Sequence, residues 1–479
     1  MLKIKDNRFY LVGIKGTGLS AFAELLLKSG AYVSGSDTPE KFYTDEVLKS
    51  LGISFREGFS ADNLPEDTDC VIYSSAYNPE ENPDLKEAVR RGIPIMEYTK
   101  ALGAFSEAYD AGGIAGVHGK TTTTAITGTL LKALDAPAAV LAGSAVSNFD
   151  GRSTFVNGDR FFVAETCEYK RHFMSFCPAR IIVTSIEPDH LDFYPTYKDI
   201  FEAFVDYAML LPAGGELIYC ADDPGCLELA ETVQQKRPDI KLVPYGHNAA
   251  GDYRIVYSEV KNSLNCFRVA GFDTEFAMQI PGEHVVLDGV AALAMTVSVV
   301  RKWKGEPDAG DIERIRQGFA GFRGSKRRSE ILGTAAGILF MDDYAHHPTA
   351  IRLTLEGIRR FYPGRKLVVD FMSHTYSRTE GLLEEFASSF GAADEVILNN
   401  IYASAREKNS GSDLDRRFFE ALCRHHSNVK YFPRPDDGFD YLKTHLQRDH
   451  IFITMGAGDN WTVGKRLYKH FSCEKEVLI

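Results

Sequence analysis

The sequence predicts an α/β protein of three domains, each containing a largely parallel β-sheet. Short apolar strand-like runs alternate with helical stretches over most of the chain, a pattern typical of parallel α/β layers. The length of 479 residues predicts about three domains, because one hydrophobic core does not grow so large. We expect domains at residues 1–111, 112–323 and 324–479. The second boundary is the weaker one, because the run DIERIRQGFAGF fits either side.

The first predicted domain opens with a strand, a glycine turn and a helix in the run YLVGIKGTGLSAFAELLLKSG. The turn contains Gly13, Gly16 and Gly18, and the next strand ends at Asp37, about twenty residues later. This layout is similar to a dinucleotide-binding fingerprint, in which the acidic residue binds a ribose hydroxyl. The spacing, however, is G-x-x-G-x-G instead of G-x-G-x-x-G. NAD, another diphosphate such as that of a UDP-sugar, and a purely structural turn all stay open.

The second predicted domain opens with the glycine-rich run GGIAGVHGKTTTT. A glycine turn between a strand and a helix lets backbone N–H groups approach phosphate oxygens, and the helix N-terminus adds a positive potential. In such a loop Lys120 would reach the β- and γ-phosphates, and the hydroxyl of Thr121 would hold Mg²⁺. The spacing departs from the strict phosphate-loop pattern, and a glycine turn can also serve only to start a helix. Four consecutive threonines start a helix poorly, so the run favours an ATP site.

Acidic residues follow two later strands of the same block. In parallel sheets, binding sites collect at the carboxyl ends of strands, and Mg²⁺ prefers oxygen ligands. Beside a phosphate loop, these residues are therefore candidates for a magnesium site. Solvated loop residues or helix caps are the alternative. The residues are Glu165 and Glu168 in FFVAETCEY, and Glu187, Asp189, His190 and Asp192 in IIVTSIEPDHLD.

The third predicted domain contains two polar segments that each follow an apolar strand. They are ILFMDDYAHHPTAI, with His346 and His347, and VVDFMSHTYSRTEGLLEEF, with Arg378. Adjacent histidines in a loop do not easily bind one ion together, and zinc requires further Cys or His ligands. Arg378 and the basic run 326–328 suit a carboxylate or a phosphate, because a guanidinium group offers a bidentate fork. A solvated hinge between domains is the alternative for the basic run.

Composition and charge exclude several classes of protein. Apolar residues make up 44% and charged residues 25% of the chain, the balance of a globular protein. The net charge of −12 argues against a nucleic-acid partner, because a phosphate backbone requires a basic surface. The sequence has no uninterrupted run of about 18 apolar residues and no secretory signal, which predicts a cytoplasmic protein without a membrane partner. The eight cysteines form no C-x-x-C pair, so reduced thiols are expected.

Taken in order, these motifs resemble those of the Mur ligase family over nearly the whole chain. GIKGTGLSAFAELLLKSG with VSGSD is similar to the family's UDP-binding domain, and GIAGVHGKTTTT is similar to its ATP loop. SIEPDHLD is similar to its central metal segment, and DDYAHHPT, SHTYSRT, IYASAREK and TMGAGDNW are similar to its C-terminal signatures. The resemblance implies an N-terminal Rossmann-like UDP-binding domain, a central P-loop ATPase domain and a C-terminal Rossmann-like ligase domain.

The resemblance also implies a reaction. An ATP-dependent ligase of peptidoglycan synthesis would join L-alanine to the lactyl carboxylate of UDP-N-acetylmuramic acid through an acyl phosphate. The implied metal is Mg²⁺, with Mn²⁺ as a substitute, and the implied assembly is a monomer or a homodimer. The preference for alanine over serine or glycine does not follow from the sequence.

Positions that match the family's motifs take on implied roles. The catalytic positions are Lys120, His190, His346 and Arg378, the last pairing with the carboxylate of the amino acid. The ATP-binding positions are Gly116, His118, Gly119, Lys120, Thr121, Thr122, His284 and Asp288. The metal-binding positions are Thr121, Glu165 and His190. The substrate-binding positions are Gly13, Gly16, Thr17, Gly18, Ser36, Asp37, Arg327, Tyr344 and His346.

Some positions depart from the family's pattern. The adenine-side motif GxHNxxNxxAA reads GEHVVLDGVAA, so Val285 and Asp288 replace two asparagines. An aspartate accepts a hydrogen bond from an adenine amino group but, unlike an asparagine, does not donate one. Ser185 and Thr375 stand where the family often has Asn and Arg, and Lys15 replaces a glycine of the first turn.

Three other functions compete with this expectation. Another family member attaches a recycled tripeptide to the same UDP-sugar, but the turn GTGLS lacks the GTFMGG pattern of that group. A non-catalytic UDP-sugar-binding protein of the same fold is supported only by the altered adenine motif. An NAD-dependent oxidoreductase leaves GKTTTT unexplained.

Overall fold

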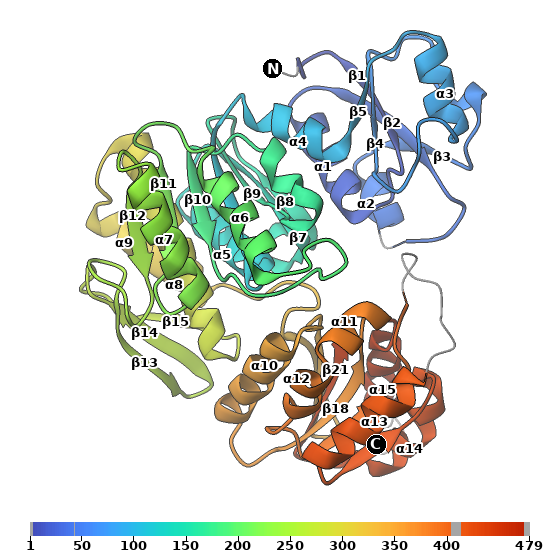
Figure 1. The fold of residues 1–479 in the computed structure, drawn as a ribbon, viewed down its shortest axis with the longest axis vertical. Coiled ribbons are helices and arrows are strands. Elements are labelled where there is room, and N and C mark those ends of the chain that lie inside the picture. The colour runs from blue at the N-terminus through green and yellow to red at the C-terminus, as the bar shows by residue number, and fades with distance from the viewer. Residues whose placement is uncertain (1–2, 43, 404–412, 474–479) are drawn as a thin grey trace. The chain divides into compact units, whose positions relative to one another are not determined.

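The structure is a computed structural model that describes residues 3–42, 44–403 and 413–473 (Figure 1). Residues 404–408 of the motif IYASAREK lie outside the described residues. The chain divides into two compact units. The first unit comprises Met1–Ile186, Ile200–Arg254 and Asp288–Phe319, and the second comprises Glu187–Asp199, Ile255–Leu287 and Ala320–Ile479.

The N-terminal sheet of the first unit is parallel, with strand order β3-β2-β1-β4-β5. Its strands are β1 (Arg8–Val12), β2 (Tyr32–Asp37), β3 (Ser54–Glu57), β4 (Cys70–Tyr73) and β5 (Ile95–Glu97). The helices around it are α1 (Thr17–Lys28), α2 (Thr44–Ser50), the short η1 (Ala61–Asn63), α3 (Pro83–Arg90) and α4 (Tyr98–Ser106). The central strand, RFYLV, is buried after its first residue, as expected for a parallel sheet covered on both faces. The turn from β1 to α1 therefore lies at the carboxyl edge of the sheet.

The second sheet of the first unit has the strand order β12-β11-β10-β6-β9-β7-β8, in which the β7–β8 pair is antiparallel and the others are parallel. Its strands are β6 (Asp110–Ala115), β7 (Ala138–Val146), β8 (Arg152–Val156), β9 (Phe161–Glu165), β10 (Arg180–Val183), β11 (Glu216–Cys220) and β12 (Lys241–Tyr245). The helices of this part of the chain are α5 (Lys120–Ala133), η2 (Ser147–Phe149), η3 (Tyr169–Ser175), α6 (Tyr197–Ala208), α7 (Pro224–Lys236), α8 (Glu283–Lys304) and α9 (Ala309–Ala320).

The middle strand β6 contains two glycines because side chains approach both of its faces closely. A Cβ atom on Gly112 would lie 2.9 Å from Sδ of Met295, and one on Gly113 would lie 2.1 Å from the hydroxyl of Tyr207. Successive residues of a strand face opposite sides of the sheet. Helix α8, which carries Met295, and helix α6, which carries Tyr207, therefore cover opposite faces.

Helix α8 is long and apolar enough to cross a membrane by length and composition alone. A search for uninterrupted apolar runs misses it, because Asp288, Thr296 and Ser298 interrupt the apolar stretch. Of its most apolar window, 78% is buried inside the structure. Such burial is typical of the core helix of a globular domain, so the helix is weak evidence for a membrane span.

The second unit contains a small antiparallel sheet and a larger, mostly parallel one. The small sheet, in the order β13-β14-β15, consists of β13 (Ile255–Lys261), β14 (Leu264–Val269) and β15 (Phe276–Met278). The larger sheet has the order β16-β17-β21-β18-β19-β20, and its β16–β17 pair is antiparallel. Its strands are β16 (Glu330–Ala335), β17 (Ile338–Asp343), β18 (Lys366–Met372), β19 (Glu395–Leu398), β20 (Val429–Tyr431) and β21 (His450–Gly456). Its helices are α10 (Pro348–Phe361), α11 (Tyr376–Gly381), α12 (Leu383–Ser388), α13 (Leu414–His425), η4 (Pro435–Gly438), α14 (Phe439–His445) and α15 (Trp461–Cys473).

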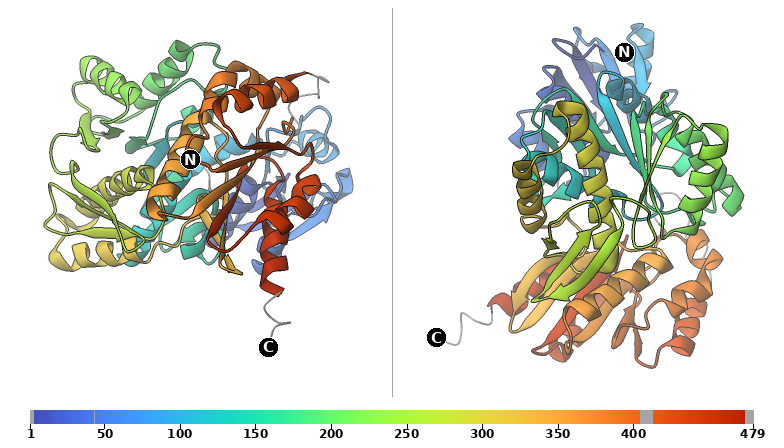
Figure 2. Two further views of the ribbon diagram at one scale, coloured as in Figure 1. Left: turned by 90° about the horizontal axis from the view of Figure 1, so that it is seen from below. Right: turned by 90° about the vertical axis from the view of Figure 1, so that its left-hand side faces the viewer.

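Apolar side chains of the larger sheet alternate between its two faces. In β18, Leu367 and Val369 belong to a core shared with α10, α12 and α13, whereas Val368 belongs to a core shared with α14 and α15. These two groups of helices lie on the two sides of the sheet (Figures 1 and 2). Alternate residues of the strand thus pack against helices on opposite faces, which gives three layers, with the sheet between two layers of helices.

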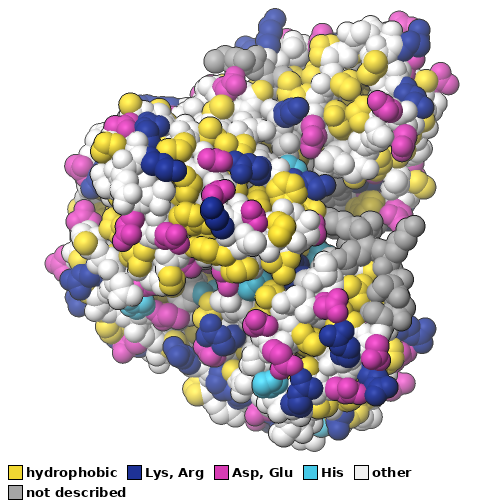
Figure 3. Space-filling model, viewed as in Figure 1, with side chains coloured by type: hydrophobic (Ala, Val, Ile, Leu, Met, Phe, Trp, Pro, Cys, Tyr) yellow, Lys and Arg dark blue, Asp and Glu magenta, His cyan; other side chains and the backbone are white. Residues whose placement is uncertain are grey.

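The surface carries charges of both signs. Over the described residues on the face that Figure 3 shows, Lys and Arg side chains are interspersed with Asp and Glu. Interspersed charges of this kind keep a protein soluble without a strong field of one sign.

Asp370 is a fully buried carboxylate in the middle of β18. The side-chain amide of Asn460 donates to the carbonyl oxygen and to Oδ1 of Asp370, each at 2.9 Å. Among the described residues, no hydrogen-bond partner faces Oδ2 of Asp370. Burial raises the pKa of Asp370 to about 7, although the amides of Asn460 and Asn399 act in the opposite direction. Ionised Asp370 therefore lowers the stability of the folded state at neutral pH.

We expect the substitution Asp370→Asn to raise the midpoint of thermal unfolding at pH 8 and to change it little at pH 4. An acid whose pKa is raised by folding contributes full stability below its unfolded-state pKa of about 3.9, and that contribution is lost as the pH rises through the folded pKa. The loss amounts to at most about 4 kcal/mol. Melting curves of both proteins between pH 4 and pH 8 measure the difference. A shift of the same size at every pH would contradict the role of ionisation.

Candidate active site

The glycine-rich loop of residues 116–119 joins β6 to α5 in the first unit. Gly116 and Gly119 have φ angles of 131° and 79°, which side chains rarely adopt. A Cβ atom on Gly116 would lie 2.0 Å from Oγ1 of Thr184, and one on Gly119 would lie 2.3 Å from Oδ1 of Asp288. Both the backbone conformation and the lack of space therefore require glycine at these two positions.

Two polar residues from other parts of the first unit fix this loop. The backbone N–H groups of Val117 and His118 donate to the carbonyl oxygen and the hydroxyl of Ser185, each at 3.0 Å. Asp288 accepts a hydrogen bond from the hydroxyl of Thr123 at 3.2 Å. The altered adenine-motif residue Asp288 thus contacts the phosphate-loop helix, and its expected contact with adenine stays a prediction.

Lys120, the first residue of α5, is paired with Glu168. Its Nζ atom lies 3.0 Å from a carboxylate oxygen of Glu168 and donates to the carbonyl oxygen of Gly116 at 2.5 Å. The exposed fraction is 14% for the Lys120 side chain and 2% for that of Glu168. Burial alone lowers the pKa of Lys120, but the negative charges of Glu168 and its neighbours raise the pKa above its ordinary value. The lysine is therefore held in its charged form beside the loop.

Thr121 and Glu165 form the second polar pair at this edge. The hydroxyl of Thr121 donates to Oε2 of Glu165 at 2.8 Å, and the backbone N–H of Gly143 donates to the same oxygen at 2.9 Å. Glu165 is the last residue of β9, so its carboxylate lies at the carboxyl edge of the sheet. A hydroxyl and a carboxylate this close provide two of the oxygen ligands that Mg²⁺ prefers, and the remaining ligands are typically waters and phosphate oxygens.

The first glycine turn, between β1 and α1, is held by its own acidic residue. Gly13 has a φ angle of 86°, and a Cβ atom there would lie 2.6 Å from the ring of Tyr77. The carboxylate of Asp37 accepts hydrogen bonds from the backbone N–H of Lys15 at 2.6 Å and from the hydroxyl of Tyr77 at 3.2 Å. Asp37 thus stabilises the turn, and a contact with a ribose stays a prediction.

The other predicted residues of this turn have separate surroundings. The N–H of Gly16 donates to the carbonyl of the turn's first glycine at 3.1 Å, and Thr17 begins α1. Gly18 lies against a tyrosine ring. The hydroxyl of Ser36 donates to the buried carboxylate of Asp84, so this hydroxyl already has a partner within the domain.

In the second unit, Arg378 is bound to the segment that follows β10. Its Nε and Nη2 atoms donate to Oδ1 of Asp189 at 3.1 and 2.8 Å, and Nη1 lies 3.3 Å from Nδ1 of His374. Burial alone would raise the pKa of Asp189, but the charge of Arg378 lowers this pKa well below its usual range. The same Oδ1 accepts the backbone N–H of His190 at 2.7 Å, and His190 has a φ angle of 52°. The pair therefore anchors the predicted metal segment within this unit.

His346 and Tyr344 lie close together after β17. Nδ1 of His346 lies 2.8 Å from the carbonyl oxygen of Tyr344, and because a carbonyl only accepts, Nδ1 carries the proton. Burial, together with the charge of Arg378, holds the pKa of His346 well below its ordinary value. The neutral ring thus presents its lone pair on Nε2. Arg327 lies over the ring of Tyr344 and donates to Asp342 at 3.1 Å, so its predicted role toward substrate also stays a prediction.

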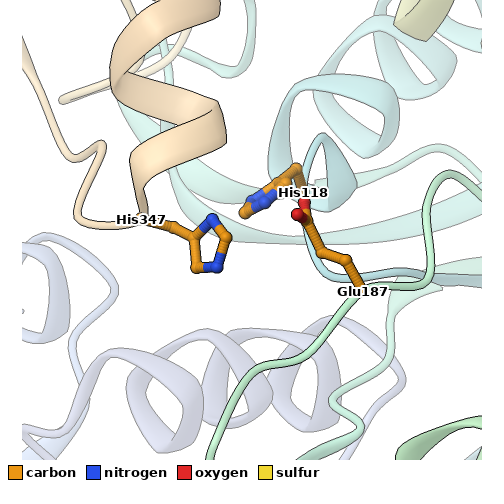
Figure 4. Close-up of side chains that lie close together, drawn as sticks. All are labelled: His118, Glu187 and His347. Atoms are coloured by element: carbon orange, nitrogen blue, oxygen red, sulfur yellow. The ribbon is translucent and has the colours of Figure 1, made fainter. Parts of the chain in front are cut away.

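The two adjacent histidines of the second unit face different partners. The ligand atoms of Glu187 and His347 lie within 4.8 Å of one another, and Figure 4 draws both side chains. The hydroxyl of Thr349 also donates to Glu187, at 3.0 Å. His346, in contrast, hydrogen-bonds to the backbone carbonyl of Tyr344 in the same loop.

The structure brings the predicted residues together in part. Lys120, Thr121, Glu165 and Asp288 cluster around the phosphate loop, whereas His284 belongs to the second unit and lies against Gly282. Sequence reasoning missed several contacts at these sites. Ser185 appeared only as a departure from a motif, and no local signal points to Thr184, Gly143 or Tyr98.

A glycine loop between a parallel strand and a helix, with a buried lysine and a hydroxyl–carboxylate pair, defines a nucleoside-triphosphate-dependent enzyme. Comparison with models of known families gives the particular kind. The model of the Mur ligase family catalytic domain matches residues 8–110, that of the Mur ligase middle domain matches residues 114–296, and that of the Mur ligase glutamate ligase domain matches residues 327–458. The chain belongs to the Mur ligase family. The predicted three-domain α/β fold is confirmed.

Individual relatives are similar over nearly the full length. The UDP-N-acetylmuramate–L-alanine ligase of Treponema pallidum is 49% identical over 98% of each chain. The structure of the UDP-N-acetylmuramate-alanine ligase of Thermotoga maritima has a TM-score of 0.76 and 24% identity, covering 98% of this chain and 99% of that one. A murein peptide ligase of Psychrobacter arcticus has a TM-score of 0.66 and 21% identity, covering 97% and 99%. The two structural likenesses, at these identities, show the fold alone.

We expect Asp189→Asn and Arg378→Gln each to lower the midpoint of thermal unfolding by roughly 5–15 °C, because each leaves one buried partner uncompensated. The double variant is expected to lose clearly less than the sum of the two, since the pair is removed as a whole. Melting curves of the four proteins give this double-mutant cycle. Strictly additive shifts would mean that the two side chains do not stabilise one another.

Proposed function

We propose that this chain is an ATP-dependent ligase that joins L-alanine to the lactyl carboxylate of UDP-N-acetylmuramic acid in peptidoglycan synthesis. The observation that carries the proposal is the 49% identity over 98% of the chain to a ligase of that name. The phosphate loop with Lys120 agrees with the use of ATP. The predicted domains at residues 1–111, 112–323 and 324–479 would bind the UDP-sugar, ATP and the amino acid in turn.

The ATP site of this proposal is the loop of residues 116–119 with the start of α5. The backbone N–H groups at the start of α5 and the charge of Lys120 would bind the phosphates, and Thr122, His284 and Asp288 complete the proposed ATP-binding set. Mg²⁺ fits the oxygen pair of Thr121 and Glu165, while His190 is the proposed ligand of a second ion. When bound, the metal would offset the negative charge that develops during phosphoryl transfer.

The first chemical step activates a poor electrophile. A carboxylate oxygen of the sugar substrate attacks the γ-phosphorus of ATP, the bond to the β-phosphate oxygen breaks, and ADP leaves. Lys120 would stabilise the charge on the transferring group, because its ammonium is already desolvated and fixed beside the loop. The product is an acyl phosphate, which has a far better leaving group than a carboxylate.

The second step forms the amide bond. The amine of alanine attacks the acyl carbon, a tetrahedral intermediate collapses, and phosphate leaves. Arg378 engages three of its five N–H groups with Asp189 and His374, so two N–H groups are available for the carboxylate of alanine. The lone pair on Nε2 of His346 suits a hydrogen bond from the amine, whose proton would leave with the phosphate, and Tyr344 borders the same place.

The UDP-sugar would bind at the first glycine turn, through Gly13, Gly16, Thr17 and Gly18 at the start of α1. Ser36, Asp37 and Arg327 complete the proposed substrate-binding set. An ATP-consuming reaction is expected in the cytoplasm, and a monomer or homodimer without a membrane or nucleic-acid partner stays our prediction.

The experiment that tests the proposal measures phosphate release from ATP and Mg²⁺ with UDP-N-acetylmuramic acid. L-alanine, glycine, L-serine and the tripeptide L-Ala-γ-D-Glu-diamino acid are compared as acceptors. We expect release that requires the UDP-sugar and is fastest with L-alanine. Preference for the tripeptide would identify a recycling ligase instead. Binding of the UDP-sugar without release would identify a non-catalytic binding protein.

We expect Lys120→Met to reduce kcat at least about a hundredfold, because the group that stabilises the transferring phosphoryl loses its charge. Lys132→Met is the matched control, since Lys132 lies near the other end of α5 and, within the described part of the chain, binds only a backbone carbonyl at the surface. The ligation assay measures both variants, and melting curves confirm that both fold. A Lys120→Met enzyme as active as the control would exclude Lys120 from the reaction.

A further inference from the structure

Tyr98, the first residue of α4, lies directly against the first glycine turn of the same unit. A Cβ atom on Gly18 would be 3.1 Å from Cε1, Cζ and the hydroxyl oxygen of Tyr98. Gly18 does not have a positive φ angle, so the turn does not need glycine there for its conformation. The phenol ring occupies the space that a side chain at position 18 would fill.

The surroundings of Tyr98 favour the protonated form of its hydroxyl. Burial raises the pKa of Tyr98 far above its ordinary value, and the negative charge of Glu165 raises it further. Glu165 is the carboxylate that accepts the hydroxyl of Thr121 beside the phosphate loop. The hydroxyl of Tyr98, which lies against the first glycine turn, therefore stays protonated as a donor.

The ring of Tyr98 is held by aromatic neighbours. It meets Phe22 edge to face, with 5.9 Å between ring centroids, and Phe22 meets Phe105 in the same way at 5.6 Å. Among the described residues, the hydroxyl of Tyr98 makes no hydrogen bond. A buried or half-buried tyrosine usually has a partner for its hydroxyl. Packing thus fixes the ring of Tyr98, while its hydroxyl can donate a hydrogen bond to a ligand.

The proposed substrate has to extend from the first glycine turn to the phosphate loop. Its diphosphate would bind at the N-terminus of α1, and its lactyl carboxylate has to reach the γ-phosphate of ATP. A donor that lies against Gly18 is located at the start of that path.

We infer that Tyr98 is a further substrate-binding residue, whose hydroxyl donates a hydrogen bond to the diphosphate–sugar portion of UDP-N-acetylmuramic acid beyond the α-phosphate. This inference rests on the proposed function. It assigns to the ring a role in shaping the turn and to the hydroxyl a role in holding the substrate.

The test compares Tyr98→Phe with the unmodified full chain in titration calorimetry without ATP. The substitution keeps the ring against Gly18 and Phe22 and removes only the hydroxyl, so folding is expected to be unchanged in melting curves. We expect roughly tenfold weaker binding of UDP-N-acetylmuramic acid, as for the loss of a hydrogen bond to a charged group. Binding of UMP and of ATP is expected to be unchanged.

Tyr109→Phe is the matched control. Tyr109 stacks on Phe105 in the same aromatic cluster, with 4.9 Å between ring centroids. The three atoms nearest to a Cβ on Gly18 belong to Tyr98 and not to Tyr109. In steady-state ligation, Tyr98→Phe is expected to raise KM for the UDP-sugar about tenfold while kcat and KM for ATP stay near their original values. If Tyr98 had a purely structural role, the substitution would change kcat and both KM values together or would change none of them.

Each outcome decides the inference. Equal binding of UDP-N-acetylmuramic acid by Tyr98→Phe and the unmodified chain would overturn it while leaving the ligase function intact. Equal weakening toward UMP would also overturn it, because the turn itself would then be disturbed. If the unmodified chain binds the UDP-sugar but does not ligate, the proposed function fails and the binding comparison still decides the role of Tyr98. If the unmodified chain does not bind the UDP-sugar, both fail.

Discussion

The positive charge of Lys120 is mostly withdrawn from water, and the rest of the phosphate-loop site depends on how that charge is balanced. Burial opposes the charged form, but Glu168 lies 3.0 Å away and keeps the lysine protonated. Glu165, three residues earlier, instead binds the hydroxyl of Thr121. Of the two carboxylates at the end of β9 and just after it, one thus balances a cation and the other binds a hydroxyl. The desolvation of the ammonium is compensated before any nucleotide binds, which is a form of preorganisation.

Lys120 stands at the start of α5 only because the preceding backbone turns sharply. The positive φ angles of Gly116 and Gly119 provide that turn, and the side chains of Thr184 and Asp288 fill the space beside them. The first turn of the chain uses the same device, with Gly13 against a tyrosine ring. In both sheets a strand is followed by a glycine turn and a helix, so each helix begins at the carboxyl edge of its sheet. The two turns therefore share one construction.

Local signals account for what the sequence predicts correctly. The alternation of apolar strands and helices gives the α/β class, and the runs of strand, glycine turn and helix locate both turns, whose ligands stay predictions. Neither signal needs a distant partner. Long-range contacts carry no such signal. Arg378 and Asp189 are 189 positions apart, and Asp288 and Thr123 are 165 apart, so no spacing rule links them. Asp288 has the chemistry of an adenine acceptor, yet its contact with the phosphate-loop helix depends on where α8 lies.

The number of donors that still lack a partner shows which residues with suitable chemistry can bind a ligand without first losing another contact. An ammonium has three donors, and those of Lys120 already meet two loop carbonyls and Glu168, so a phosphate has to displace at least one contact. Arg378 has two N–H groups to spare, and Tyr98 has its only donor available among the described residues. Binding of a phosphate at Lys120 would therefore require an exchange of partners, whereas a ligand at Tyr98 would satisfy a donor that has no partner among the described residues. The exchange at Lys120 favours a reversible contact that depends on charge. The open donor of Tyr98 favours a hydrogen bond that fixes the position of the ligand.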